Sequence, residues 1–506
     1  MSRKNGGIIG PANTPVGGII TGVASGVWRT NDLLNFVGNN QWPKAPENIE
    51  NSCLFDGSGY AQRSISTAGS GTTATFSAWV KPSALPDKAI FTSYIDSNNF
   101  VEIYFNSGAF RVYHYDSGGT SNDIKTTPVY KDESAWYNFH VIFDTTNGTE
   151  ADRIKMYVNG AEVTALATSN YPTSSQDLEL SSTSATFNLG ARNGDEQWKG
   201  YMAEVVFIDG QALTPSSFGE TNTATGIWTP KKIGQIANAG TNSFYLNFKD
   251  SSNLGKDESG LSNNFTVSGL ASTDQMTDTC VENFATLNPN VVNKSYNDGS
   301  LAEGNLKFAP GGRAIACSTI GVTKGKWYAE FKATDAGALS IGVGDLQLGI
   351  QAIGQSNPIY YDNNPSYAIG YYNSNGNLSY NGTSTSYGNS YTDNDIIGVA
   401  LDMDNYAVYF SKNGTFQNSG DPTSGSSKTG DATSTASYNP LNSGEPMFLF
   451  VEDFSAAGVG ECLLNFGNPP FSISSGNSDA NGHGNFEYSV PSGYYALNTS
   501  NLNTYG

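Results

Sequence analysis

The chain has 506 residues and carries 46 acidic against 26 basic side chains, a formal net charge of −20. A single hydrophobic core stops growing near about 250 to 300 residues, so a one-domain protein is excluded. The negative charge repels nucleic acid phosphates and anionic membrane surfaces, and we expect neither as a partner. Aromatic residues make up 12% of the chain and charged residues only 14%, which is typical of β-rich proteins with polar turns.

The N-terminal arm, residues 1–46, is rich in Gly and Pro and has no strict periodicity. Its apolar residues are interrupted too often for a secretory h-region or a membrane span, so we expect neither ordinary export nor membrane insertion. A floppy terminus is one interpretation. The other is an arm that anchors the chain on a partner through apolar side chains with no local cover, namely Ile8, Ile9, Ile19, Ile20, Val27 and Trp28.

Residues 47–220 contain short apolar strands separated by turn residues, which predicts an all-β sandwich. Residues 100–105 and 110–115 flank an Asn-Ser-Gly turn and predict a hairpin. Three further stretches resemble the laminin-G-like jelly roll of the concanavalin A type: residues 156–163, 187–192 and 200–213.

Residues 221–300 carry fewer strand signals and are expected to connect two domains. Within them, residues 244–248 and 250–266 look like the segment that opens a laminin-G-like module, but no complete second module follows. This segment either closes the first sandwich or bridges the two domains.

A second domain is expected at residues 301–470, followed by a C-terminal segment at 471–506. Residues 395–414 are two apolar strands joined by a polar turn and closed by an Asn-Gly pair. Together with residues 325–331 they resemble a SPRY domain, a β-sandwich used for recognition. The predicted fold class is therefore all-β, with two β-sandwich domains and an extended N-terminal arm.

The pairing of these two modules is accompanied by two further motifs. They are Phe-Gly-x-x-Pro-Phe at residues 466–471 and Pro-x-Gly-Tyr-x-Ala-Leu-Asn at residues 491–498. This combination is similar to virion fibre and spike proteins of marine tailed phages. The resemblance implies a location on the virion surface, at the tail or the capsid. It implies contacts with other virion proteins through the arm, a glycan or protein of the host surface as partner, and a homotrimer. A tail fibre or spike is the leading interpretation, and a capsid-surface decoration fibre is the alternative.

Catalysis is not expected from the carboxylates of the chain. The concanavalin A-like fold also houses glucanases, whose Glu-x-Asp-x-x-Glu strand places acid and base on one face. The nearest candidates here, Glu204 and Asp209, are five residues apart, so a regular strand points them to opposite faces. His114, His140 and His483 form no catalytic motif either, and strand patterns predict framework roles for the first two. A glycan-degrading enzyme remains a less favoured alternative.

Candidate ligand-binding residues lie in segments where Tyr is mixed with Asn, Ser and Gly. This mixture suits recognition because Tyr supplies rigid amphipathic area and the small polar residues supply hydrogen bonds. The candidates are Tyr360, Tyr361, Asn363 and Tyr387 in the SPRY-like domain, expected at loop tips, and Trp198 in the loop before Gly200. Simple packing is the alternative for each aromatic residue, and for Trp198 exposure and burial are both open.

A calcium ion is the cofactor that the laminin-G-like resemblance would allow, because loop carboxylates and amides supply the oxygen ligands that this hard cation prefers. The candidate ligands are Asp96 and Asn98 in one loop and Asp195 and Glu196 in another. Solvated turns are the alternative. The four cysteines are far apart and form no CxxC pair, so free thiols are expected.

Overall fold

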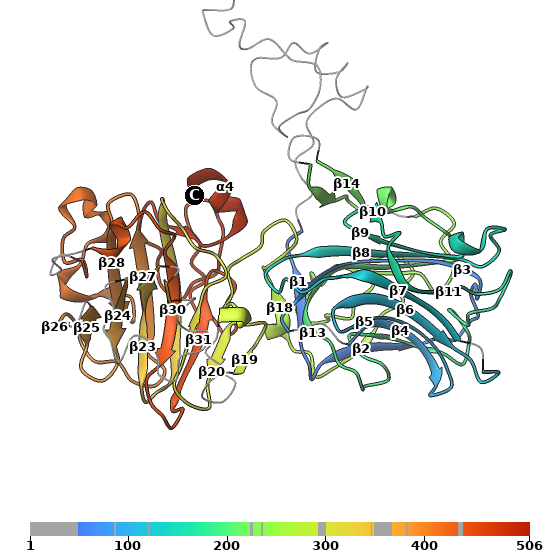
Figure 1. Cartoon of the computed structure of the whole chain (residues 1–506), viewed down its shortest axis with the longest axis horizontal. Helices are drawn as coiled ribbons and strands as arrows, with labels where there is room; N and C mark the ends of the chain where they lie inside the picture. Colours follow the sequence, from blue (N-terminus) through green and yellow to red (C-terminus); the bar gives the residue numbers. More distant parts are fainter. Residues whose placement is uncertain are drawn as a thin grey trace, which may run out of the picture.

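The computed structural model describes residues 49–84, 88–119, 121–222, 226–233, 236–291, 300–345, 347–348, 367–380, 383–433 and 439–506. These residues are nearly all β and form two sandwiches that lie side by side along the long axis (Figure 1), which confirms the predicted fold class. The anchoring candidates of the N-terminal arm, from Ile8 to Trp28, lie outside the described residues. No helix among the described residues is long and apolar enough to cross a membrane.

The first sandwich is formed by two mostly antiparallel sheets that enclose one apolar core. The first sheet has the order β10 (Ala161–Glu162), β9 (Ile154–Val158), β8 (Tyr137–Asp144), β3 (Thr73–Pro82), β13 (Lys199–Asp209), β1 (Ser52–Asp56) and β18 (Gln275–Met276), with β16 (Phe244–Leu246) paired to β13. The second has the order β11 (Leu166–Asn170), β7 (Ser121–Val129), β6 (Ala109–Tyr115), β5 (Asn99–Asn106), β4 (Ala89–Asp96), β12 (Thr186–Leu189), β2 (Tyr60–Ser64) and β17 (Thr266–Ser268). A separate ribbon pairs β14 (Gly219–Thr221) with β15 (Trp228–Pro230).

Aromatic side chains fill the space between these two sheets. Phe91 on β4 lies 5.1 Å from Phe76 and 5.4 Å from Phe207, measured between ring centroids. Phe244 on β16 joins the same cluster, with its ring 5.9 Å from that of Phe207. Because each buried ring removes a large apolar area from water, this cluster accounts for the pairing of strands that lie far apart in the sequence.

The second sandwich is also formed by two sheets. One has the order β19 (Ser300–Ala302), β20 (Lys307–Ala309), β31 (Gly460–Asn465), β22 (Lys326–Ala336), β27 (Ile396–Asp402), β28 (Ala407–Lys412) and β29 (Thr415–Phe416), with β32 (Tyr495–Ala496) parallel to β22. The other has the order β21 (Ala314–Cys317), β30 (Phe448–Asp453), β23 (Leu339–Gly344), β24 (Ala368–Tyr372), β25 (Asn377–Tyr380) and β26 (Thr383–Ser386). Asn413 and Gly414 turn the chain from β28 into β29 with φ angles of 48° and 77°, as the Asn-Gly pair predicted.

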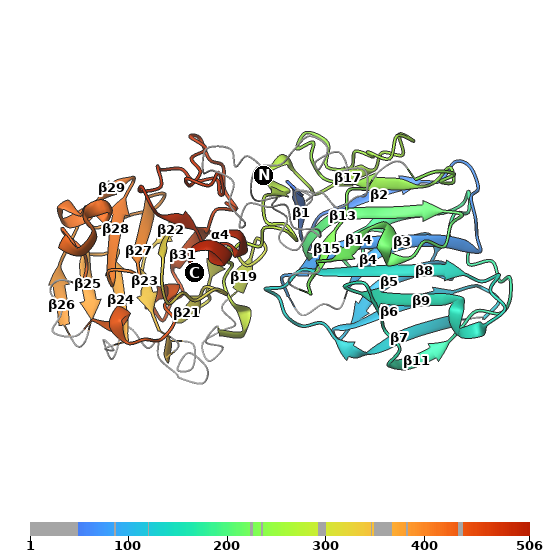
Figure 2. The same ribbon diagram turned by 90° about the horizontal axis from the view of Figure 1, so that it is seen from above.

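Helical structure is short throughout the described residues. The α-helix α4 (Thr499–Tyr505) ends the chain on the side of the second sandwich that faces the first (Figure 2). The 3₁₀ turns are η2 (Glu150–Asp152), η3 (Pro215–Ser217), η4 (Ser272–Asp274), η5 (Pro289–Val291), η6 (Gln417–Ser419), η7 (Pro422–Ser427) and η8 (Pro440–Asn442).

The segment expected to connect the domains contributes β16, β17 and β18 to the first sandwich. The chain then crosses to the second sandwich at Asp278, whose carboxylate forms a buried ion pair of 2.6 Å with Lys81. The amide oxygen of Asn468, from the second sandwich, accepts a hydrogen bond of 3.3 Å from the Asp278 backbone N–H. The Tyr201 hydroxyl donates to the carbonyl oxygen of Gly304 at 2.9 Å. Polar contacts therefore join the sandwiches directly.

All four cysteines are free thiols, as predicted, and Cys53, Cys317 and Cys462 are buried.

Candidate functional site

An aromatic face covers the outer side of β4, β5 and β6 in the first sandwich. Alternation along β5 sends Val101 and Ile103 into the core and leaves Phe100 on the other side. Phe100 pairs with Tyr94 on β4 and with Tyr115 on β6, with centroid distances of 6.4 and 6.2 Å. Tyr113 stacks on Tyr115 at 6.4 Å and 13°. The rings of Tyr94, Tyr113 and Tyr115 are only partly buried, so they form a platform that a ligand can reach.

Two guanidinium groups are fixed against this aromatic face. Arg111 pairs with the carboxylate of Asp123 through two hydrogen bonds of 2.6 and 2.7 Å, and its guanidinium carbon lies 4.8 Å from the centroid of Tyr113. The Arg192 guanidinium lies 5.4 Å from the centroid of Phe100. A guanidinium group that is paired with a carboxylate and stacked on a ring keeps its orientation before a ligand binds.

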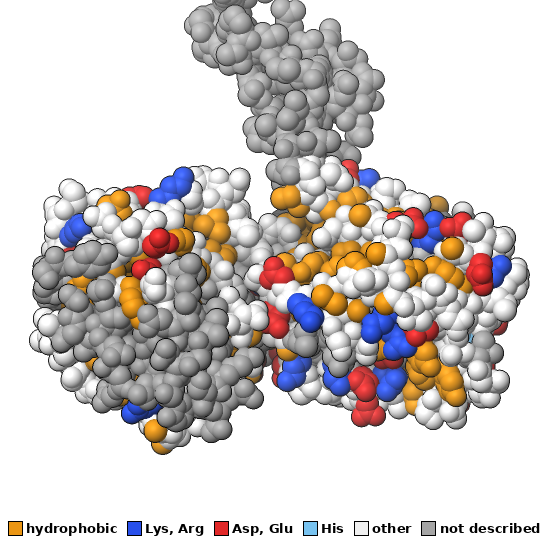
Figure 3. All heavy atoms as spheres, viewed as in Figure 1, with side chains coloured by type: hydrophobic (Ala, Val, Ile, Leu, Met, Phe, Trp, Pro, Cys, Tyr) orange, Lys and Arg blue, Asp and Glu red, His pale blue; other side chains and the backbone are white. Residues whose placement is uncertain are grey.

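Glu102 occupies the middle of this face, opposite Tyr113 in the register of β5 and β6. Its side chain is 3% exposed and lies 3.4 Å from Arg192. Burial raises the pKa of Glu102 to about 7, while Arg192 acts in the opposite direction. Figure 3 shows Lys, Arg, Asp and Glu side chains interspersed with hydrophobic ones on the surface of the first sandwich. Such a surface can stack on the apolar side of a sugar ring and exchange hydrogen bonds with its hydroxyl groups.

The aromatic face was not predicted from the sequence, although a signal was present. Every second residue of the predicted hairpin is aromatic or charged. A side of a sheet that only faces water needs no more than small polar residues at these positions. Phe100, Glu102, Arg111, Tyr113 and Tyr115 carry this pattern. Whether these side chains lie on the surface depends on which side of the sheet faces the core. The packing of the two sheets determines that side.

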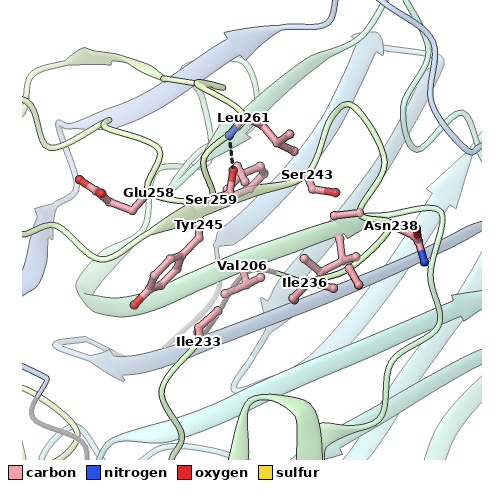
Figure 4. A pocket seen from close by; sticks show the side chains of 13 residues that line it. Val206, Ile233, Ile236, Asn238, Ser243, Tyr245, Glu258, Ser259 and Leu261 are labelled. Carbon is pink, nitrogen blue, oxygen red and sulfur yellow. Dashed lines mark hydrogen bonds between the residues drawn. The ribbon is translucent and has the colours of Figure 1, made fainter.

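A cavity of about 410 Å³ lies on the outer side of the opposite sheet (Figure 4). Val206 on β13 and Ile233 and Ile236 from the segment after β15 give it an apolar lining. Tyr245 on β16 also lines it, and its hydroxyl donates to Glu204 at 2.6 Å. This cavity suits a small apolar group.

The structure corrects the prediction for Tyr387, which is buried and not at a loop tip. Its side chain is 7% exposed, and its ring lies 5.8 Å from that of Tyr371. The phenol oxygen accepts a hydrogen bond of 3.2 Å from the backbone N–H of Phe410. Tyr387 directly follows β26, and the pairing of β26 with β25 brings this position beside the core.

Trp198 is likewise a core residue and not a ligand platform. It is 1% exposed, and its ring stacks on Phe105 with a centroid distance of 5.5 Å. Its backbone N–H donates to the Gly190 carbonyl at 2.8 Å, which ties the loop to the sandwich. The other candidates in the second domain, Tyr360, Tyr361 and Asn363, lie outside the described residues and stay predictions.

The calcium candidates each have partners of their own. The Asp96 carboxylate accepts hydrogen bonds from the Asn98 backbone at 2.7 Å and from the Asn99 amide at 2.9 Å, and these bonds lower its pKa. Glu196 pairs with Lys88 at 2.8 Å, and the backbone of Asp195 bonds to that of Arg192 in a tight turn. No group of three or more His, Cys, Asp or Glu side chains among the described residues could hold a metal ion. The geometry therefore favours the turn interpretation for Asp96, Asn98, Asp195 and Glu196.

Glu204 and Asp209 do not form an acid–base pair around a common site. The carboxylate of Glu204 is bonded to Tyr245, and that of Asp209 accepts the Ser70 backbone N–H at 2.7 Å. A bulge interrupts β13 between Ala203 and Val206. The two carboxylates are thereby engaged with different parts of the sandwich.

His114 and His140 are framework residues, as predicted. His114 bonds through Nδ1 to the Asn122 side chain at 2.9 Å, and His140 bonds through Nε2 to the Leu213 carbonyl at 3.0 Å. Burial lowers the pKa of His140 to about 4.

Comparison with known proteins identifies both modules. Residues 55–217 match the family model of the concanavalin A-like lectin/glucanases superfamily, and residues 326–431 match that of the SPRY domain. The chain thus contains a concanavalin A-like domain followed by a SPRY domain, as the two resemblances predicted. No curated protein matches the chain.

Several solved structures are similar to about a third of the chain. The SPRY domain of human HERC1 is 18% identical, with 35% of this chain and 96% of that chain covered and a TM-score of 0.25. Domain 4 of AbnA, a GH43 extracellular arabinanase from Geobacillus stearothermophilus, is 22% identical, with 35% and 76% covered and a TM-score of 0.26. A SAP-like pentraxin from Limulus polyphemus is 17% identical, with 33% and 80% covered and a TM-score of 0.25.

Proposed function

We propose that this chain is a virion surface protein, a tail fibre or spike of a tailed phage, that attaches to glycans of the host surface, and that this attachment involves no catalysis. The observation that carries the binding role is the aromatic face of the first sandwich, where partly exposed rings lie beside Arg111, Arg192 and Glu102. Two modules of families used for recognition support the same role.

The two motifs that carry the resemblance to phage fibres have a structural role at the domain junction. Asn468, within the first motif, accepts a hydrogen bond from the Thr277 backbone at 2.9 Å. The Leu497 carbonyl, within the second, accepts a hydrogen bond from the Ala285 backbone at 2.9 Å. Both motifs therefore hold the connector between the modules.

Attachment at an open aromatic face is expected to be weak for one copy. Linking several copies raises the overall avidity without any new contact, which is why a homotrimer suits this function. The N-terminal arm would join the trimer to other virion proteins through Ile8, Ile9, Ile19, Ile20, Val27 and Trp28. Light scattering on the intact protein measures the oligomeric state, and imaging of virions with an antibody separates a tail fibre from a capsid decoration.

A whole-cell binding assay tests the attachment site. The double variant Tyr113→Ala/Tyr115→Ala removes two rings of the platform, and we expect cell binding to fall at least about tenfold because stacking area is lost. Tyr406→Asn is the matched control. Tyr406 is 39% exposed in the second sandwich and has a φ of 56°, a backbone conformation that Asn tolerates. Equal binding by the double variant and the control would remove the aromatic face from the attachment site.

A further inference from the structure

Three side chains from distant segments meet beside α4, next to the domain junction. The Ser500 hydroxyl lies 3.3 Å from Nε2 of His483, and Nδ1 of His483 lies 2.5 Å from Oε1 of Glu282. Ser500 belongs to the first turn of α4, His483 to a loop of the C-terminal segment, and Glu282 to the connector between the sandwiches. A hydroxyl, an imidazole and a carboxylate in this order are the arrangement that activates a serine.

The carboxylate of Glu282 favours one tautomer of a neutral His483. Oε1 of Glu282 lies 2.5 Å from Nδ1 of His483 and also accepts from the side-chain amide of Asn498 at 2.8 Å. An ionised carboxylate can only accept, so a neutral imidazole carries its proton on Nδ1 and leaves Nε2 to accept the proton of Ser500. Burial raises the pKa of Glu282, whereas the neighbouring His483 opposes that rise.

The surrounding backbone holds this arrangement in place. Oδ1 of Asp479 accepts the His483 backbone N–H at 3.0 Å, and Oδ2 accepts the Asn501 side-chain amide at 2.7 Å. Asp479 therefore ties the loop that carries His483 to the helix that carries Ser500. Asn498 caps α4 by accepting the backbone N–H of Asn501 at 2.8 Å.

The cluster is open to solvent as well as ordered. The side chains of His483 and Glu282 are 24% and 23% exposed, and Ser500 is partly exposed. A substrate carried on a large molecule can therefore approach Ser500 without entering a deep cavity.

We propose that Ser500 is a nucleophile for acyl transfer from esters of small carboxylic acids, such as O-acyl groups on glycans, with His483 as its general base. In the first step the Ser500 oxygen adds to the ester carbonyl carbon while Nε2 takes the hydroxyl proton. The bond to the alcohol then breaks, and the alcohol leaves with that proton. Water releases the acyl group from Ser500 by the same route, so the net reaction converts ester and water into acid and alcohol. Glu282 is a positioning residue that fixes the imidazole.

This activity is independent of glycan attachment at the aromatic face. The contacts of Glu282 and His483 would also exist in a purely structural ion pair that pins the C-terminal segment to the connector. The reactivity of Ser500 distinguishes a catalytic site from such a structural ion pair.

The test is acylation of the full chain by p-nitrophenyl acetate, followed by intact-mass measurement and peptide mapping. When acid stops the reaction before water releases the acyl group, we expect an acetyl group on the peptide that contains Ser500, and no label there in Ser500→Ala. His483→Gln should slow acylation about 10²- to 10⁴-fold, the range of general base catalysis. Ser492→Ala, at an exposed serine of the same segment, should leave the rate unchanged.

The role of Glu282 is tested by rescue. Glu282→Gln should lower the acylation rate, and Glu282→Asp should restore part of it, while both variants keep the thermal unfolding temperature within a few degrees of each other. Ser500→Ala removes only a hydroxyl, so we expect this variant to fold, and circular dichroism checks that it does. The loss of label in Ser500→Ala can then be interpreted even if His483→Gln unfolds. An unlabelled Ser500, or labelling that persists at an equal rate without His483, would overturn the proposal.

Discussion

Two pairs of tyrosines, one pair in each sandwich, have opposite environments. In the first sandwich, Tyr113 and Tyr115 stack on the outer side of the sheet and are partly exposed. In the second, Tyr387 and Tyr391 lie within the core, and the Tyr391 hydroxyl donates to the Leu339 carbonyl at 3.0 Å. Neighbouring Asn, Ser and Gly residues therefore do not decide whether a tyrosine is exposed. The position of the residue relative to the sheet decides it, so one set of tyrosines is expected to carry binding and the other stability.

The largest effect is expected from truncating a core tyrosine. Tyr391→Ala removes a ring that is 1% exposed and should lower the free energy of unfolding by about 3 to 5 kcal/mol, as other aromatic truncations in cores do. Tyr115→Ala, at the aromatic face, should cost less than about 1 kcal/mol. Urea unfolding of both variants measures the difference. Equal losses in the free energy of unfolding would mean that the tyrosines of the core and of the aromatic face contribute equally to stability.

The junction between the sandwiches should respond strongly as well. Lys81→Met leaves the carboxylate of Asp278 buried without its cation, and such a loss costs about 3 kcal/mol or more. The double variant Lys81→Met/Asp278→Asn should recover part of this loss because no charge stays buried. Calorimetry of the intact chain checks both variants. A double variant as unstable as the single one would contradict a charge-based explanation.

Glu102 should make the first sandwich less stable as the pH rises. Its folded pKa is about 7, above its ordinary value of 4.5, so the folded chain holds this proton more tightly than the unfolded chain. The resulting stability is fully present below about pH 4.5 and is lost as the pH rises through 7, by at most about 3 kcal/mol. Glu102→Gln should flatten this dependence. Urea unfolding at pH 5 and pH 8 measures it, and an unchanged slope in the variant would assign the effect to other groups.

Much of the fold was predictable because its signals are local. The Asn-Gly turn at Asn413 and Gly414 and the strand alternation in residues 100–115 are set by neighbouring residues alone. The two sheets of each sandwich then pack with their apolar sides toward each other, because this arrangement buries those sides.

The site was less predictable because it depends on tertiary contacts. Trp198 and Tyr387 lie in segments with loop composition, but the sheets beside them draw both rings into the core. His483 had no catalytic spacing in the sequence, since its partner Glu282 lies far away along the chain and meets it only when the connector folds. Strand register likewise brings Arg192 from a loop onto the ring of Phe100.

Hydroxyl-radical footprinting of the full chain tests whether attachment occurs on the aromatic face. The experiment compares the chain alone with the chain bound to polysaccharide from a susceptible host. We expect protection of Tyr94, Tyr113 and Tyr115 and unchanged reactivity of Tyr406. Protection confined to the second sandwich, for example at Tyr360 and Tyr361, with unchanged reactivity at the aromatic face, would contradict it.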